Sequence, residues 1–281
     1  MFDFFDQPVS AVPDSPTASI DSSVLQSFDS GKTFVISVSG HSLYHNSPQN
    51  AFISKFNNSV NNLVNKGYKL VLVAGGGTLA TELQGSSKSM GADAFQRDLM
   101  GIKATQMNAL LLIHGIEKAY HEPCKSISQA KEIIQKNQVP VFGGLFPSLT
   151  SDSVSALLAE FLHCPFINMT NVDGVFDINP SKFKQAKLIE KMNHLQLIKL
   201  VARDSFNLSG SSIITDLSTA LILNRSKIQS FVLNFNDLNN FENCVEGLQF
   251  KGTIINGKNE PMQVNKDTIQ VEKEIQNYSE V

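Results

Sequence analysis

Residues 69–80, with the sequence KLVLVAGGGTLA, decide the fold. The apolar run Lys69–Ala74 has the length and composition of a buried strand, and a helical pattern begins near Thr78. Glycines 75–77 stand at the junction. Because glycine loses much backbone entropy on folding, three in a row predict a close approach of the backbone to another group. A helix N-terminus also favours phosphate, so we expect either a phosphate cradle or a tight turn here.

The same order of strand, turn and helix recurs along the chain. Five buried strands are predicted, at Thr33–Val38, Lys69–Ala74, Val139–Phe142, Phe166–Thr170 and Gln229–Phe235. Helices are predicted at Asn50–Asn65, Thr78–Met90, Phe95–Gly115, Ser126–Lys136, Asp152–Leu162 and Ile213–Arg225. This alternation predicts an α/β fold, a three-layer sandwich with a central, mostly parallel sheet between helices. Such sheets bind ligands at the carboxyl ends of their strands.

Two polar segments flank the alternating unit, which we place at residues 32–256. Residues 1–31 contain five aspartates and three prolines but no lysine or arginine, so we expect a flexible acidic arm. Residues 257–281 form a second polar segment and are predicted to be a C-terminal tail. The sequence thus predicts one folded domain between two tails.

Composition excludes several classes of function. With 23 basic and 26 acidic residues, the net charge of −3 does not support a general electrostatic grip on nucleic acid or on a membrane surface. No apolar run approaches the roughly 20 residues of a membrane span. Cys124, Cys164 and Cys244 are odd in number and far apart, which fits neither a disulfide framework nor a metal knuckle. We therefore expect a cytoplasmic protein that binds any anion locally.

Polar turns follow the other predicted strands as well. Ser39-Gly40-His41 follows the first strand, and Gly143-Gly144 leads through residues 145–151 to Asp152 at the start of a helix. The segment 171–180 combines Asn, Asp-Gly and Asn-Pro with an aromatic residue. Each turn also has a plain structural interpretation: Ser151 or Asp152 would cap a helix, and the residues of segment 171–180 are typical of tight turns.

The order and the amino-acid sequences of these blocks resemble those of the amino acid kinase family, and within it the archaeal type of uridylate kinase. The resemblance spans roughly residues 32–255. Its strongest blocks are VFGG at 141–144, TSDSVSALLAE at 150–160, TNVDGVF at 170–176 and GSSII at 210–214. The runs VAGGG at 73–77, DLMGI at 98–102 and NALLL at 108–112 support them.

The resemblance implies an enzyme that transfers the γ-phosphate of ATP to UMP, with Mg²⁺, as a cytoplasmic homohexamer. It implies Asp152 as the carboxylate that organises catalysis, and it assigns no residue as a metal ligand. The residues implied to contact ATP are Ser37, Val38, Ser39, Gly40, His41, Gly77, Thr81, Thr170, Asn171, Phe176 and Asn179. The residues implied to contact UMP are Gly76, Asp98, Leu145, Phe146, Pro147, Ser148, Leu149, Thr150 and Ser151. Its partners would be these two nucleotides and other copies of the chain.

Three neutral residues, Ser37, Thr81 and Gln106, stand where the wider family places cations. The cations that lie near the blocks in sequence either replace them or belong to the solvated surface; they are Lys88, Arg97, Lys103, Lys182, Lys184 and His41. The neutral positions leave two alternatives open. One is a non-catalytic protein that binds or stores nucleotides or oxyanions on the same fold. The other is a related kinase that acts on another small phosphate or carboxylate acceptor.

Overall fold

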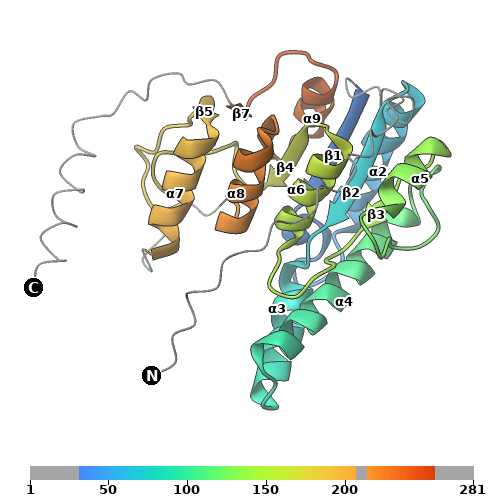
Figure 1. The fold of residues 1–281 in the computed structure, drawn as a ribbon, viewed down its shortest axis with the longest axis horizontal. Helices are drawn as coiled ribbons and strands as arrows, with labels where there is room; N and C mark the ends of the chain where they lie inside the picture. Colours follow the sequence, from blue (N-terminus) through green and yellow to red (C-terminus); the bar gives the residue numbers. More distant parts are fainter. Residues whose placement is uncertain (1–31, 207–213, 257–281) are drawn as a thin grey trace, which may run out of the picture.

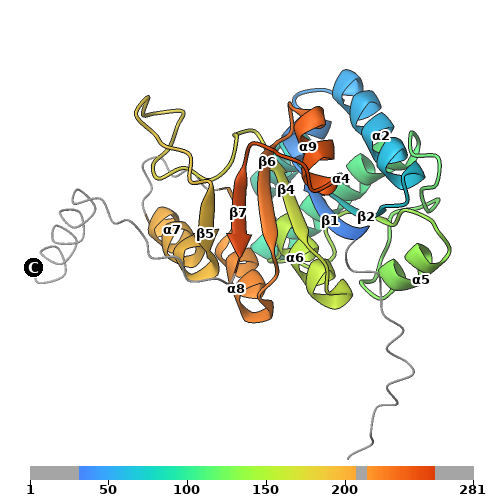
Figure 2. The same ribbon diagram turned by 90° about the horizontal axis from the view of Figure 1, so that it is seen from above.

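The computed structural model describes residues 32–206 and 214–256, so the predicted acidic arm and C-terminal tail lie outside the described residues. Its centre is a seven-stranded sheet in the order β3-β2-β1-β4-β6-β7-β5 (Figures 1 and 2). The strands are β1 (Thr33–Val38), β2 (Lys69–Ala74), β3 (Val141–Phe142), β4 (Phe166–Thr170), β5 (Lys191–Asn193), β6 (Ser230–Asn234) and β7 (Thr253–Asn256). Neighbours pair in parallel except β6 and β7, which are antiparallel. The predicted α/β class with a mostly parallel sheet is confirmed.

Alternation along β1 assigns its side chains to the two faces of the sheet. Phe34, Ile36 and Val38 belong to one buried cluster, whereas Val35 belongs to the other. Ser37 therefore lies on the Val35 face. The β1–β4 register places Asn168 directly opposite Ser37, so two polar side chains stand together on that face near the carboxyl ends of their strands.

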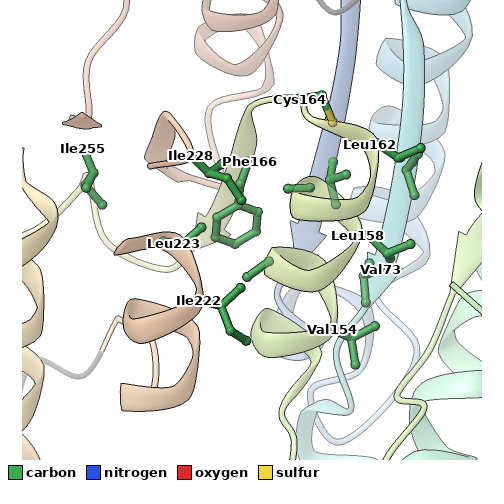
Figure 3. Packing of buried hydrophobic residues seen from close by; sticks show 14 of the residues in the cluster. Val73, Val154, Leu158, Leu162, Cys164, Phe166, Ile222, Leu223, Ile228 and Ile255 are labelled. Carbon is green, nitrogen blue, oxygen red and sulfur yellow. The ribbon is translucent and has the colours of Figure 1, made fainter. Parts of the chain in front are cut away.

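Helices cover both faces of the sheet and complete the three layers (Figure 2). Side chains of α2, α4 and α9 pack on one face, and those of α5, α6, α7 and α8 pack on the other. Figure 3 shows Leu158 of α6 beside Val73 of β2, with Leu223 of α8 near Phe166 of β4. The helices are α1 (Gly40–Leu43), α2 (Asn50–Asn65), α3 (Gly77–Ser89), α4 (Ala94–Ile113), α5 (Gln129–Gln135), α6 (Ser151–Leu162), α7 (His194–Phe206), α8 (Leu217–Ser226) and α9 (Leu238–Val245).

Helices α3 and α4 lie side by side and extend beyond the sheet (Figure 1). Asp93, which lies between two of the predicted helices, caps α4 in a capping box with Gln96. Within the described ranges, no helix combines the length and the apolarity that a membrane crossing needs.

Some predicted bounds were wrong, and two of the reasons are local. β3 begins at Val141 rather than Val139, because Pro140 lacks the N–H that a strand donates. α8 begins at Leu217 rather than Ile213, because Asp216 is its N-cap. β5, β7, α1, α7 and α9 were not predicted.

Candidate functional site

The turns that follow β1 and β2 pack directly against each other. A Cβ atom at Gly40 would lie 1.9 Å from the Gly77 nitrogen, and one at Gly75 would lie 2.5 Å from the Gly40 nitrogen. Gly77 also has a φ of +60°, which favours glycine. From α4, the Asn108 amide donates to the carbonyl oxygens of Gly75 (2.8 Å) and Gly76 (3.1 Å). Gly75 and Gly77 therefore make the close approach that the sequence predicted. The backbone that they approach is the turn after β1.

Two cavities open at the carboxyl edge of the sheet. The first, which we call the Asp98 cavity, has a volume of about 290 Å³. Its lining consists of α3, α4 and the segment after Gly143, namely Gly76, Ala80, Gln84, Asp98, Gly101, Ile102, Thr105, Gly144, Phe146, Ser148, Leu149, Thr150 and Ser151. Most of the residues expected to contact UMP therefore come together here. Of that set, Leu145 and Pro147 do not line the cavity, and Leu145 packs against the core.

Hydrogen bonds to α4 fix the loop that closes the Asp98 cavity. The Gly144 N–H donates to the Thr105 hydroxyl at 2.6 Å, and that hydroxyl in turn donates to the Ile102 carbonyl at 2.6 Å. The Ser148 N–H donates to the Asp98 carboxylate at 2.7 Å. Asp98 therefore positions the loop as well as lining the cavity.

The second cavity, the Asp152 cavity, has a volume of about 300 Å³. It is lined by the ends of β1, β2 and β4 and the starts of α6 and α8, namely Ser37, Ser39, Gly40, Gly75, Gly76, Thr150, Ser151, Asp152, Asn168, Met169, Thr170, Ile214, Thr215 and Asp216. Gly76, Thr150 and Ser151 line both cavities. The two cavities are therefore adjacent, with these three residues between them.

Asp152 is held by the two polar side chains of the sheet. Ser37 Oγ donates to one carboxylate oxygen at 2.7 Å, and Asn168 Nδ2 donates to the other at 3.0 Å. Burial raises the pKa of Asp152; the hydrogen bond from Ser37 opposes this shift, and the negative charge of Asp216 adds to it. Asn168 was not predicted as a site residue, although a polar residue inside a buried strand was a signal for it.

Asp216 joins the starts of α6 and α8. Its carboxylate accepts from the Thr219 N–H (3.0 Å), the Thr219 hydroxyl (2.7 Å) and the hydroxyls of Thr150 (2.5 Å) and Ser153 (3.1 Å). Burial acts to raise the pKa of Asp216, but these hydrogen bonds outweigh it and leave the pKa below its usual value. Thr150 is itself the N-cap of α6, so the expectation of Ser151 or Asp152 in that role was wrong.

The site's electrostatics combine helix N-termini with carboxylates. α3, α6 and α8 all begin at the cavities, and a helix N-terminus carries partial positive charge and N–H groups that lack helical partners. Among the described residues that line either cavity, the charged side chains are Asp98, Asp152 and Asp216, with no lysine, arginine or histidine. The cations proposed from the sequence as replacements do not line the cavities: Lys103 donates to Gln106 (3.2 Å), and Arg97 donates to the Asp93 carbonyl (3.3 Å).

Several residues expected to contact ATP lie outside the Asp152 cavity lining; they are Val38, His41, Gly77, Thr81, Asn171, Phe176 and Asn179. Val38 belongs to the core, and the exposed His41 ring faces that of His45 with centroids 5.7 Å apart. The Thr81 hydroxyl donates to the Gly77 carbonyl at 3.3 Å. Asn179 accepts from Ser181 within its own turn. Most of the block at 210–214 lies outside the described residues.

The chain is similar to known proteins in both sequence and fold. The model of the amino acid kinase family matches residues 32–234. A uridylate kinase from Archaeoglobus fulgidus is 36% identical over 190 residues, 66% of this chain and 84% of that protein. One from Pyrococcus abyssi is 32% identical over 79% of this chain and 98% of its own length. The crystal structure of the Archaeoglobus fulgidus uridylate kinase superposes with a TM-score of 0.70 at 34% identity, covering 79% of this chain and 99% of that one.

Proposed function

The chain belongs to the amino acid kinase family, and on that premise we propose that it is a UMP kinase, which transfers the γ-phosphate of ATP to UMP. One observation carries the proposal: two cavities meet at Gly76, Thr150 and Ser151. A reaction between two substrates needs adjoining sites that bring the reacting atoms together. The names of the relatives, uridylate kinases, supply the identities of the substrates.

We assign ATP to the Asp152 cavity and UMP to the Asp98 cavity. The N-terminus of α6, capped by Thr150, lies between the two cavities, where the transferred phosphoryl group would pass. Backbone N–H groups at the starts of α3 and α6 would hold its oxygens. This supports phosphate binding at a site whose described lining has no cationic side chain.

Asp152 would orient the reacting groups rather than remove a proton. The acceptor, a phosphate oxygen of UMP, is already anionic near neutral pH, so the transfer needs positioning and charge stabilisation more than a general base. Ser37 and Asn168 fix both oxygens of the Asp152 carboxylate. Asp152 would therefore provide a negative charge in a fixed position, which would organise cations around the phosphates.

The cofactor that we propose is Mg²⁺, and the residues present fit it. Mg²⁺ takes oxygen ligands and usually binds through one or two carboxylates together with substrate phosphates. One Asp152 oxygen accepts from Ser37 and the other from Asn168, and each keeps a lone pair for a cation. Bound there, Mg²⁺ would neutralise charge on the phosphate oxygens.

We further propose, from the resemblance, that the protein works in the cytoplasm as a homohexamer.

A steady-state assay with a panel of acceptors tests the proposed function. UMP, CMP, AMP and small carboxylates are each supplied with ATP and Mg²⁺, and formation of ADP is followed. We expect kcat/KM to be highest with UMP. A higher kcat/KM with another acceptor would favour the related-kinase alternative. ATP binding without transfer to any acceptor would favour the non-catalytic alternative.

A further inference from the structure

Gln84 of α3 places an amide group at one end of the Asp98 cavity. The lining follows α3 through Gly76, Ala80 and Gln84, which are spaced four residues apart along one face of the helix. At 1.5 Å per residue, Gln84 lies about 12 Å along α3 from Gly76. Gly76 borders the Asp152 cavity as well, so the UMP phosphate belongs at the Gly76 end. The uracil base would then lie toward Gln84.

The neighbours of Gln84 agree with this placement. The Gln84 amide packs on Gly101 of α4, where a Cβ atom would lie 2.6 Å from Gln84 Nε2. Asp98, which the resemblance implies to contact UMP, lies in the same part of α4. Phe146 also lines the cavity and is 45% exposed. A base can stack on an aromatic face, but such stacking accepts every base, so the choice of uracil needs a polar group.

A hydrogen bond fixes the orientation of the Gln84 amide. Its Nε2 atom donates to the carbonyl oxygen of Arg97 at 3.2 Å. Because a carbonyl oxygen can only accept, the amide cannot turn over and place its own oxygen there. Gln84 Oε1 has no hydrogen-bond partner among the described residues, and Nε2 keeps a second N–H. The cavity therefore contains one acceptor and one donor in a fixed order.

This order matches uracil and opposes cytosine. Uracil has a donor at N3 beside an acceptor at O4, so Gln84 Oε1 can accept from N3 while Nε2 donates to O4. Cytosine reverses the two groups, because its N3 is an acceptor and its N4 amine is a donor. An amide that is free to turn over could pair with either base. The bond to the Arg97 carbonyl prevents that rotation.

We propose that Gln84 determines the specificity for uracil over cytosine, and that the Arg97 carbonyl holds its amide in the orientation that selects uracil. The inference rests on the proposed function, because that function places UMP in the Asp98 cavity. It adds the residue that distinguishes UMP from CMP. A two-point contact between an amide and a base changes discrimination by about tenfold to a hundredfold, and we expect a preference of this size.

Equilibrium binding of UMP and CMP tests the inference without phosphoryl transfer. Each nucleotide is titrated into the full chain, without ATP, by isothermal titration calorimetry. In wild type the Kd for CMP should exceed that for UMP about tenfold to a hundredfold. Gln84→Met keeps the length of the side chain and suits a helix, but it removes both the donor and the acceptor. It should weaken UMP binding and bring the ratio of the two Kd values close to one. The ratio of kcat/KM for the two acceptors, measured with ATP and Mg²⁺, should change by the same factor.

Two further variants separate recognition of the base from a general effect on the helix. Gln135→Met makes the same change at an exposed position outside both cavities and should keep the wild-type ratio. Gln84→Glu keeps an acceptor but has no donor for the Arg97 carbonyl or for O4 of uracil. Its carboxylate can accept from the cytosine amine, so the ratio should move toward CMP further than in Gln84→Met. The added charge weakens the binding of both nucleotides, which is why the ratio is compared.

Two results would overturn the inference. One is the absence of a preference for UMP over CMP in wild type, in binding and in kcat/KM. The other is a preference that Gln84→Met retains in full. If UMP is phosphorylated in either case, the kinase assignment stands and only the role of Gln84 fails. If Gln84→Met removes a binding preference for UMP but no acceptor is phosphorylated, the role of Gln84 stands and the proposed function fails.

Discussion

The Ser37 hydroxyl on β1 donates to the Asp152 carboxylate at the start of α6, at 2.7 Å. The two residues are 115 positions apart in the chain. Alternation along β1 and the position of Asp152 in the first turn of α6 bring them to the same end of the sheet. This bond fixes the orientation of the carboxylate and opposes the rise of its pKa caused by burial.

Ser37→Ala removes a donor that stabilises the charged form of Asp152, so the pKa of that carboxyl should rise further. The acid limb of the profile of kcat/KM against pH should then shift to higher pH. Ser37→Thr, which keeps the hydroxyl, is the matched variant and should shift the limb less. Identical profiles for wild type and Ser37→Ala would show that this bond does not tune Asp152.

Asp152→Asn should stabilise the metal-free protein at pH 7 while reducing phosphoryl transfer. Because the pKa of Asp152 is raised in the folded state, its charged form opposes folding, and stability falls as pH rises from about 4, the unfolded value, through the folded pKa. The amide can keep both bonds, because its oxygen accepts from Asn168 and its nitrogen donates to the Ser37 hydroxyl.

The free energy of unfolding should be higher for Asp152→Asn than for wild type at pH 7, and the difference should vanish below about pH 4. Urea unfolding in the presence of EDTA at both pH values measures it. A variant less stable than wild type at pH 7 would contradict the assigned cause of the shift, which is burial reinforced by Asp216.

Asp216→Ala should lower the free energy of unfolding by about 1–3 kcal/mol at pH 7, because α8 loses its cap and the hydroxyls of Thr150 and Thr219 lose an acceptor. The pKa of Asp216 is lowered, so its contribution is present above the unfolded value and is lost as pH falls. Asp216→Asn, which retains a capping oxygen, should lose less. A chemical-denaturation series from pH 7 to pH 3 should show the three proteins converging; a constant gap would argue against an ionic contribution.

Thr105→Val should raise the KM for UMP more than the KM for ATP. The change removes the acceptor of the buried Gly144 N–H, which costs about 1–3 kcal/mol and loosens the turn beside the Asp98 cavity. Thr105→Ser keeps the hydroxyl and should behave like wild type. Equal increases in both KM values would show that the turn does not act selectively on the acceptor.

Two glycines should respond to alanine in opposite directions. At Gly40 the new Cβ would lie 1.9 Å from the backbone nitrogen of Gly77, so Gly40→Ala should destabilise the fold by about 3 kcal/mol. At Gly85, inside α3, a Cβ meets nothing within 4 Å, so Gly85→Ala should stabilise the fold by about 0.5–1 kcal/mol. Thermal unfolding of both variants tests whether the turns after β1 and β2 pack as closely as the structure shows.

The parts of the fold that the sequence predicted have strong local signals. β1, β2 and β4 have the predicted bounds, because each is a mostly apolar run between turns. β5 has three residues, of which only Met192 is apolar, and β7 lies antiparallel to β6, an arrangement that strand and helix alternation does not predict. Short elements that depend on a neighbouring strand leave little local signal.

In the candidate site, too, the residues with a local sequence signal were predicted and those that depend on distant contacts were not. Asp152 and the glycine turns were predicted because they follow strands. Asp216 was predicted only as part of a helix, because its contact with Thr150 joins residues 66 positions apart. The place of Thr215 in the lining of the Asp152 cavity depends on three-dimensional packing, and no spacing rule in the sequence indicates it.

Transfer of label from [γ-³²P]ATP under single-turnover conditions tests the central claim most directly. With UMP and Mg²⁺ present, we predict that the label passes to UDP, and that Asp152→Ala slows this step at least a hundredfold. Without UMP, the label should remain on ATP. Label that stays on ATP or appears only as inorganic phosphate in the presence of UMP, or an equal transfer rate in Asp152→Ala, would contradict the account.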